Sequence, residues 1–387
     1  MAALETTDFT SSAEELVDAQ FTDRTETLDI IHVLTRDFLQ AVAQGDNPQL
    51  SITSRSEKNV VRDENRRLRL GKIKVTKKLF VKNGTGAERY AKIWQVLSLV
   101  QKLLLEGKVA TQREAYYCLV QHFKNQSEFN DTLQVQDFIG CNYRTDVVAL
   151  TGCARSSLGI CASSSGAIAG RVQWLEGGET IDCSATTGGK LIPGVIEGVR
   201  FESLGARYIL VVEKDAVFTY LCGQRIWDSL PLVLVTGCGY PPLSVRAILK
   251  QLQTQLQLPV VGLFDYNPHG VRILLTYKYG STRMGLEAHS YAVDIKWLGV
   301  HHSDLFDPST GSVCVERSAL QQWSSADERV FNSVASRVEV IQCPHYQREM
   351  GLMRRARVKA EIEALNSRGF DTLEFKIVQK ILRKNYF

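Results

Sequence analysis

Three uninterrupted apolar runs in the second half of the chain constrain its fold most strongly. These runs are residues 208–212 (YILVV), 232–235 (LVLV) and 260–264 (VVGLF), and helix-like segments separate them. Strands that are buried on both faces have such continuous apolar sequences, and crossover helices make the strands parallel. The pattern predicts an α/β unit built around a buried parallel sheet.

Acidic and amide side chains follow two of these runs. Glu213 directly follows the first run and Asp265 the third, with Asn267 two residues further on. Ligands of parallel sheets bind beyond the carboxyl ends of the strands, so on neighbouring strands these side chains face one cleft. Such hard oxygen ligands suit Mg²⁺, which stabilises the charge on an attacked phosphodiester. The alternative is that the acids only cap the helices that follow.

The first half of the chain is predicted to be mainly helical. Apolar spacing predicts helices over residues 28–42 and 88–105, and residues 135–150 suggest a third helix or a pair. Between them, Thr111 and Glu114 form a capping-box pattern that starts a helix continuing through Phe123. A polar loop is expected over residues 124–131. Residues 157–172 read as a small β-hairpin, which gives a winged-helix outline.

The capped helix carries a tyrosine on its accessible face. At about 100° per residue, Ala115 marks a buried stripe shared with Cys118, Leu119, His122 and Phe123. Tyr117 lies roughly 200° from Ala115, next to Arg113, whereas Tyr116 lies on the flank of the core. A guanidinium one turn away stabilises a phenolate or holds the phosphate that it attacks. The alternative is a pair of surface tyrosines beside a solvated arginine.

Composition narrows the class of protein. A chain of 387 residues is long enough for two domains. No apolar run approaches ~18 residues and the N-terminus lacks a signal-peptide pattern, so we expect no membrane span and no secretion. The nine cysteines form no CxxC pair, which argues against a zinc ribbon and a disulfide framework. The formal charge of +4 decides nothing about nucleic acid. The basic stretch over residues 62–82 is either a DNA or nuclear-import patch or a solvated strand.

Six ordered segments together resemble the meiotic double-strand-break transesterase family, the eukaryotic relatives of the topoisomerase VI A subunit. The resemblance covers roughly residues 88–387. The segments are residues 111–117 (TQREAYY), 153–160 (CARSSLGI), 211–214 (VVEK), 265–270 (DYNPHG), 277–281 (YKYGS) with Met284, and 359–365 (KAEIEAL).

This resemblance implies a role for each candidate residue. Tyr117 takes the place of the nucleophile, assisted by Arg113, and Glu213, Asp265 and Asn267 take the places of the Mg²⁺ ligands. Asn267 departs from the usual second aspartate of a Toprim domain, which puts the number of bound ions in doubt. Candidate contacts to the DNA backbone are Arg155, Lys214 and Lys278, each of which is otherwise a solvated surface charge.

The resemblance also implies an organisation and a set of partners. We expect an N-terminal extension, partly disordered, over residues 1–87, a winged-helix domain over 88–176 and a Toprim domain with C-terminal helices over 177–387. The implied protein is nuclear, binds double-stranded DNA, forms a homodimer or a heterodimer with a paralogue, and works with a topoisomerase VI B-like subunit. The implied product is a 5′-phosphotyrosyl link at a double-strand break. The alternatives are a topoisomerase VI A subunit that needs an ATPase partner, a non-cleaving DNA-binding paralogue, and a generic Toprim hydrolase or primase.

Overall fold

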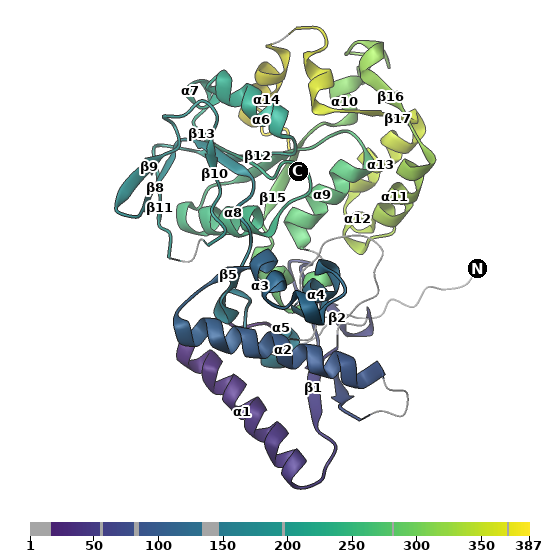
Figure 1. Ribbon diagram of the computed structural model, residues 1–387. Helices are drawn as coiled ribbons and strands as arrows, with labels where there is room; N and C mark the ends of the chain where they lie inside the picture. Colours follow the sequence, from purple (N-terminus) through teal and green to yellow (C-terminus); the bar gives the residue numbers. More distant parts are fainter. Residues whose placement is uncertain are drawn as a thin grey trace, which may run out of the picture. The chain divides into compact units, whose positions relative to one another are not determined.

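The computed structural model describes residues 17–54, 57–80, 85–133, 147–195, 198–280, 282–369 and 371–387. The chain divides into two compact units (Figure 1). The first contains Met1–Cys161 with Ser281–His289, and the second contains Ala162–Gly280 with Ser290–Phe387. The domain boundaries predicted from the sequence, between residues 87 and 88 and between residues 176 and 177, stay predictions.

The second unit is built on a mixed six-stranded sheet. The strand order is β10-β7-β13-β12-β14-β15. The three predicted apolar runs form β12 (Tyr208–Val212), β13 (Leu232–Thr236) and β14 (Val260–Leu263), and β15 (Ile295–Gly299) extends the parallel part. The strands β7 (Ala167–Gly170) and β10 (Lys190–Leu191) are antiparallel to their neighbours. The prediction of a buried parallel sheet is confirmed.

The connections place a switch point between β12 and β14. Helix α6 (Asp215–Gly223) leads from β12 to β13 on one side, whereas α8 (Leu243–Leu256) leads from β13 past β12 to β14. Because such crossovers are right-handed, α6 lies on one face of the sheet and α8 lies on the other. Helix α9 (Pro268–Tyr279), which leads from β14 to β15, lies on the same face as α8 (Figure 1). The chain leaves β12 and β14 toward opposite faces, and this is where such sheets bind ligands.

Smaller elements complete the second unit. β8 (Val172–Glu176) pairs with β9 (Glu179–Asp182) and β11 (Phe201–Ser203), and β16 (Leu320–Gln322) pairs with β17 (Val358–Ala360). The other helices of this unit include α7 (Ile226–Ser229), α10 (His302–Leu305), η6 (Arg317–Ala319), α11 (Ser325–Ala335), α12 (Val338–Ile341), α13 (Pro344–Ala356), η7 (Ile362–Asn366) and α14 (Thr372–Leu382). Tyr266 hydrogen-bonds to Ala360 through both backbone groups, which holds the segment after β17 beside the end of β14.

The first unit packs helices around a separate apolar core. Its helices are α1 (Arg24–Ala43), α2 (Thr85–Glu106), α3 (Gln112–Cys118), α4 (Gln126–Leu133) and α5 (Val147–Thr151). The strands pair as β1 (Gln49–Thr53) with β4 (Lys74–Lys78), β2 (Val60–Arg62) with β3 (Leu68–Leu70), and β5 (Ala110–Thr111) with β6 (Ile160–Cys161). The predicted helices over residues 28–42 and 88–105 are confirmed as α1 and α2. Side chains from α1, β1 and β3 contribute to the core, so part of the predicted extension is folded.

Three local predictions were wrong or only partly right. The predicted hairpin does not form, because β6 pairs with β5 in the first unit and β7 lies in the large sheet. Ile168 and Ala169 of β7 are fully buried, which suits a sheet interior and not an exposed wing. The predicted polar loop over residues 124–131 largely forms α4, because the Asn125 side chain accepts from the Glu128 N–H and Phe129 packs into the core. Of the predicted third helix, residues 135–146 lie outside the described residues, and residues 147–150 form part of α5 (Val147–Thr151).

The basic stretch over residues 62–82 is folded where it is described. It supplies β3 and β4, and the Arg69 guanidinium forms an ion pair with Asp18. Across the described ranges, no helix is long and apolar enough to cross a membrane.

Candidate active site

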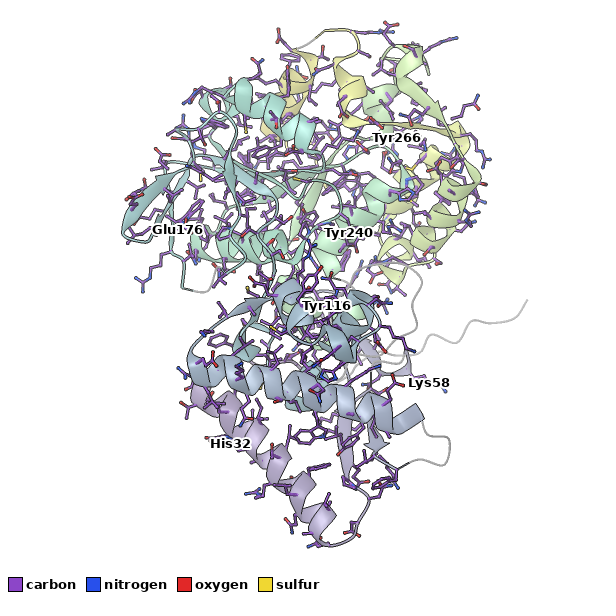
Figure 2. All side chains as sticks on the ribbon, in the orientation of Figure 1. His32, Lys58, Tyr116, Glu176, Tyr240 and Tyr266 are labelled. Atoms are coloured by element: carbon purple, nitrogen blue, oxygen red, sulfur yellow. The ribbon has the colours of Figure 1, made fainter. Side chains whose placement is uncertain are left out.

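The two predicted carboxylates lie side by side at the switch point. Val212 of β12 is in register with Leu263 of β14, so the residues that follow these strands begin at the same edge of the sheet. The Asp265 backbone N–H donates to Glu213 Oε2 at 2.9 Å, and the Glu213 N–H donates to the Leu263 carbonyl at 3.1 Å. Figure 2 labels Tyr240 and Tyr266, which belong to the loops that follow β13 and β14. The prediction that Glu213 and Asp265 share one edge is confirmed.

Burial makes both carboxylates costly to ionise. Glu213 is 8% exposed and Asp265 is 5% exposed. Burial, together with the nearby charge of Asp265, raises the pKa of Glu213 to about 7. Burial raises the pKa of Asp265 to about 6, although Lys214 and a hydrogen bond from the Ile362 N–H act in the opposite direction. A buried pair of this kind is stabilised by a cation.

Asn267 has a structural role that the two acids lack. It is the N-cap of α9, and its Oδ1 accepts from the Gly270 N–H at 2.8 Å, with Pro268 at the first helical position. The alternative that polar residues at the strand ends only cap helices therefore applies to Asn267. Glu213 is not a cap of this kind, because the N-cap of α6 is Lys214.

The donor set fits a divalent ion that takes only a few ligands from the protein. Within the part of the chain that the structure describes, no group of three or more His, Cys, Asp or Glu side chains is arranged to hold a metal. Mg²⁺ commonly binds through one or two carboxylates and completes its coordination with water and substrate phosphates. Glu213 and Asp265 provide two such carboxylates, and each uses one oxygen to accept a backbone N–H.

Because ionising the buried Glu213 and Asp265 costs free energy, we expect the stability of the fold to depend on pH and on Mg²⁺. The pKa values of both acids rise on folding, from 4.5 for Glu213 and 3.8 for Asp265, so their ionisation destabilises the fold progressively as pH rises toward 7. We expect the double variant Glu213→Gln/Asp265→Asn, whose amide oxygens still accept the backbone N–H groups, to melt several degrees higher than the wild type at about pH 8 in chelator. This difference should shrink at about pH 5, and Mg²⁺ should raise the melting temperature of the wild type alone. Equal melting curves at about pH 8 would contradict this prediction.

Lys214 lies among acidic side chains. Its Nζ is 2.8 Å from Glu361 Oε2, 2.9 Å from Glu363 Oε2 and 3.6 Å from Asp265 Oδ2. Burial acts to lower the pKa of Lys214, but these carboxylates outweigh burial and raise it. Three carboxylates therefore contact the ammonium group, so Lys214 is not a solvated surface charge.

Glu361 and Glu363 belong to the same edge of the sheet, although neither was among the predicted site residues. They lie about 150 residues beyond Lys214 in the chain, and the short strand β17 brings them to the same edge. Both lie in residues 359–365 (KAEIEAL), one of the six segments that carry the family resemblance, and this segment is the sequence signal that points to them.

Lys278 lies at the other end of α9. At ~1.5 Å per residue it is roughly 16 Å along the helix axis from the Asn267 cap. Its side chain is half-buried, with Nζ 5.7 Å from the ring centroid of Tyr346 and 6.0 Å from that of Tyr279. The structure therefore does not bring Lys278 together with the carboxylate pair.

Tyr117 is displayed on the surface of the first unit. Helix α3 begins with the predicted capping box, in which Thr111 Oγ1 accepts from the Glu114 N–H and the Glu114 carboxylate accepts from the Thr111 N–H. Ala115 is fully buried and Tyr117 is 58% exposed, as the helical wheel predicts. The Arg113 guanidinium is exposed and lies 6.0 Å from the centre of the Tyr117 ring.

Tyr116 differs from its neighbour in burial. Figure 2 labels Tyr116. Its ring is half-buried against the core and lies 6.1 Å from the ring of Phe129. The prediction that Cys118 belongs to the buried stripe was wrong, because α3 ends at this residue and the chain continues as a 3₁₀ turn that leaves Cys118 exposed. Of the two tyrosines, Tyr117 is the one whose phenol a large substrate can reach.

Arg155 is buried inside the first unit, which corrects its prediction as a DNA contact. The residue is 4% exposed, its Nε donates to Glu287 Oε2 at 2.9 Å and its backbone N–H donates to Glu287 Oε1 at 3.0 Å. A guanidinium in this environment is paired with a buried carboxylate and is shielded from a phosphate backbone.

The ion pair predicts a stability defect. Arg155→Ala leaves the Glu287 carboxylate buried without its cation, which should lower the free energy of unfolding by about 3–5 kcal/mol. The exposed control Arg113→Ala should lower it by less than about 0.5 kcal/mol. Urea denaturation of both variants measures this difference. If Arg155→Ala left stability unchanged and weakened DNA binding, the result would support the original prediction that Arg155 contacts the DNA backbone.

A parallel α/β unit with two buried acids at its switch point is the architecture of a Toprim domain, and comparisons with known proteins agree. The family of Toprim domains shared by Spo11 and the A subunit of topoisomerase 6 matches residues 208–381. The family described as "Type IIB DNA topoisomerase" matches residues 88–160. The chain therefore carries a Toprim domain that continues to the C-terminal helix.

Individual relatives are similar over most of the chain. The meiotic recombination protein SPO11-2 of Oryza sativa subsp. indica is 40% identical over 78% of this chain and 75% of its own length. The human meiotic recombination protein SPO11 is 30% identical over 90% and 85%, respectively. The A3 subunit of DNA topoisomerase 6 from the same rice is 35% identical over 72% and 60%. The chain belongs to the family of type IIB DNA topoisomerases that comprises Spo11 and the topoisomerase 6 A subunits.

Proposed function

We propose that this protein breaks double-stranded DNA by transesterification, with Tyr117 as the nucleophile. The phenol oxygen of Tyr117 forms a bond to phosphorus, and the bond from phosphorus to the 3′ oxygen breaks. The phenol loses its proton to solvent, and the leaving 3′ oxygen gains one. The product is a 5′-phosphotyrosyl link with a free 3′ hydroxyl. The observation that carries this proposal is the exposed Tyr117 beside Arg113 on a capped helix, in a chain of the type IIB topoisomerase family.

Arg113 assists the nucleophile in this proposal. A neutral phenol is a weak nucleophile, and a nearby fixed positive charge favours the phenolate or orients the phosphate that is attacked. The guanidinium is one turn from Tyr117 and is exposed, so a phosphate can reach it.

Glu213 and Asp265 hold a Mg²⁺ ion in this proposal. The ion supplies neutralisation of phosphate charge when it is bound. Asn267 was also expected as a ligand, and since its Oδ1 caps α9 we assign it the positioning of that helix start beside Asp265. Lys278 remains a proposed contact to the DNA backbone.

The biological role proposed from the relatives is the initiation of meiotic recombination in the nucleus. In this role the chain acts as a homodimer or as a heterodimer with a paralogue, together with a topoisomerase VI B-like subunit. Helices α2 to α5 with the β5–β6 pair then act as a winged-helix-type unit that presents Tyr117 to the DNA.

Two alternatives make different predictions. A topoisomerase VI A subunit would relax supercoiled DNA when its ATPase partner is added; the higher identity and coverage of SPO11-2 than of the topoisomerase A3 protein favour the meiotic role. A non-cleaving paralogue would bind DNA and form no covalent link. The exposed Tyr117 and the buried pair of Glu213 and Asp265 argue against a non-cleaving protein.

Covalent capture tests the proposal. The purified protein, by itself and with a topoisomerase VI B-like subunit, is incubated with end-labelled duplex DNA and Mg²⁺ and then denatured. We expect a label at the 3′ end of a strand to migrate with protein and a label at the 5′ end not to, since the protein joins the 5′ end of the downstream fragment. DNA binding with no protein-linked label under either condition would overturn the proposal.

A further inference from the structure

A strongly basic stretch of the chain ends beside the proposed metal pair. Residues 348–359 (REMGLMRRARVK), from the second half of α13 to β17, contain five arginine and lysine side chains and one acid. This stretch therefore has the same formal charge, +4, as the entire chain. Its acid, Glu349, is buried and accepts from the His302 N–H at 2.8 Å, so it does little to offset the cations at the surface.

Three cations of this stretch gather around the first turn of α11. Arg354 and Arg357 both bind the carboxylate of Glu328, at 3.3 and 2.8 Å, and Lys359 binds Asp327 at 3.0 Å. We call Arg354, Arg357 and Lys359 the basic cluster. Because two guanidinium groups share one carboxylate, the cluster keeps an uncompensated positive charge.

The two arginines are exposed and yet held in place. The side chain of Arg354 is 57% exposed and that of Arg357 is 60% exposed. The Arg354 guanidinium lies 5.3 Å from the ring centroid of Phe331, and the Arg357 guanidinium lies 5.9 Å from that of Trp323. Guanidinium groups suit phosphate recognition, and groups that are already oriented lose little conformational freedom when they bind. This arrangement favours an anionic ligand at the surface.

The backbone connects the basic cluster to the proposed metal pair. Lys359 precedes Ala360, which exchanges two backbone hydrogen bonds with Tyr266, at 2.9 and 3.1 Å. Tyr266 directly follows Asp265. Helices α11 and α13 and strand β17 lie together on one flank of the unit (Figure 1). A polyanion that reaches the metal pair can therefore also contact the basic cluster.

We propose that the basic cluster binds the phosphate backbone of the DNA duplex beside the cleaved bond. This inference rests on the proposed cleavage of DNA at Glu213 and Asp265. Arg354 and Arg357 each exchange part of their contact with Glu328 for a phosphate oxygen. Contacts of this kind depend on charge, so they do not distinguish base sequences.

The test measures the affinity for DNA as a function of salt concentration, in chelator, so that cleavage does not contribute. Fluorescence anisotropy follows the binding of full-length protein to two labelled duplexes of unrelated sequence. The variants are Arg354→Gln, Arg357→Gln and the double variant, and thermal melts establish that each is folded.

Arg225→Gln is the matched control. Arg225 is also exposed, binds the carboxylate of Asp228 at 2.7 Å, and lies 5.5 Å from the ring centroid of Trp227. It belongs to the connection that leads into the start of β13, at the opposite edge of the sheet from the metal pair.

Each phosphate contact contributes about 0.9 to the slope of log affinity against log salt concentration. We expect this slope to fall by about 1 in each single variant and by about 2 in the double variant, equally for both duplexes. Arg225→Gln should leave the slope unchanged. Glu328→Gln should bind DNA more tightly, because it removes the competing charge and keeps an oxygen that accepts the Trp323 N–H. Asp228→Asn should not.

A wild-type slope in the double variant would overturn this inference and leave the proposed function standing, since covalent capture tests that function separately. An equal fall in slope for Arg225→Gln, or a loss of affinity for one duplex alone, would also overturn it. Absence of DNA binding by the folded wild type would overturn both the inference and the proposed function.

Discussion

Tyr117→Phe should abolish covalent attachment to DNA, lowering cleavage by on the order of 10⁴-fold or more, as the loss of an enzyme nucleophile does. The substitution removes one oxygen atom from a side chain that is mostly exposed, so the fold and the affinity for DNA should be unchanged. Covalent capture with end-labelled DNA measures the loss, and a DNA-binding assay on the same preparation measures affinity.

Tyr116→Phe is the matched control for this prediction. It removes the same atom from the adjacent residue, whose ring is packed against Phe129. We expect covalent attachment to remain within a few-fold of the wild type. Loss of attachment in Tyr116→Phe and its survival in Tyr117→Phe would identify the half-buried Tyr116 as the nucleophile. That result would contradict the assignment of Tyr117 from its exposure on helix α3.

Glu213→Gln and Asp265→Asn should each lower the rate of cleavage by about 10²–10³-fold at a fixed Mg²⁺ concentration, the usual effect of removing one charge-stabilising group. Each variant keeps an oxygen that accepts the local backbone N–H, from Asp265 in one case and Ile362 in the other. Rates of covalent-complex formation across a Mg²⁺ titration provide the measurement.

The same titration separates a metal role from a structural one. If the acids hold the ion, higher Mg²⁺ should restore part of the lost rate, while the variants melt no lower than the wild type. Asp327→Asn is the control, because Asp327 is a buried acid that pairs with Lys359 and completes the capping box of α11 with Ser324. Wild-type rates in both Glu213→Gln and Asp265→Asn would remove these residues from the catalytic site.

The parts of the fold that sequence predicts are those with local signals. The strands β12, β13 and β14 are runs of consecutive apolar residues, and burial on both faces of a sheet requires such runs. Helix α3 is marked by its capping box and by the alternation of buried and exposed faces. Glu213, Asp265 and Tyr117 could be found because each is fixed relative to one of these elements.

The remaining features depend on distant partners. The burial of Arg155 depends on Glu287, 132 residues away, and the environment of Lys214 on Glu363, 149 residues away. The predicted hairpin failed for the same reason, since β6 and β7 are close in sequence but pair with strands of different units. Local spacing predicts that a segment is a strand, but tertiary packing decides which strand it joins.

The most direct test of the central claim is the chemical identity of the protein–DNA link. Covalent complexes are digested with nuclease and trypsin, and the peptide that retains a nucleotide is sequenced by mass spectrometry. Cleavage after Arg113 and Lys124 gives the peptide of residues 114–124, which contains both tyrosines, and fragmentation distinguishes them. We predict a 5′-linked nucleotide on Tyr117. A nucleotide on Tyr116 or on another peptide, or strand breaks without any linked peptide, would contradict the account.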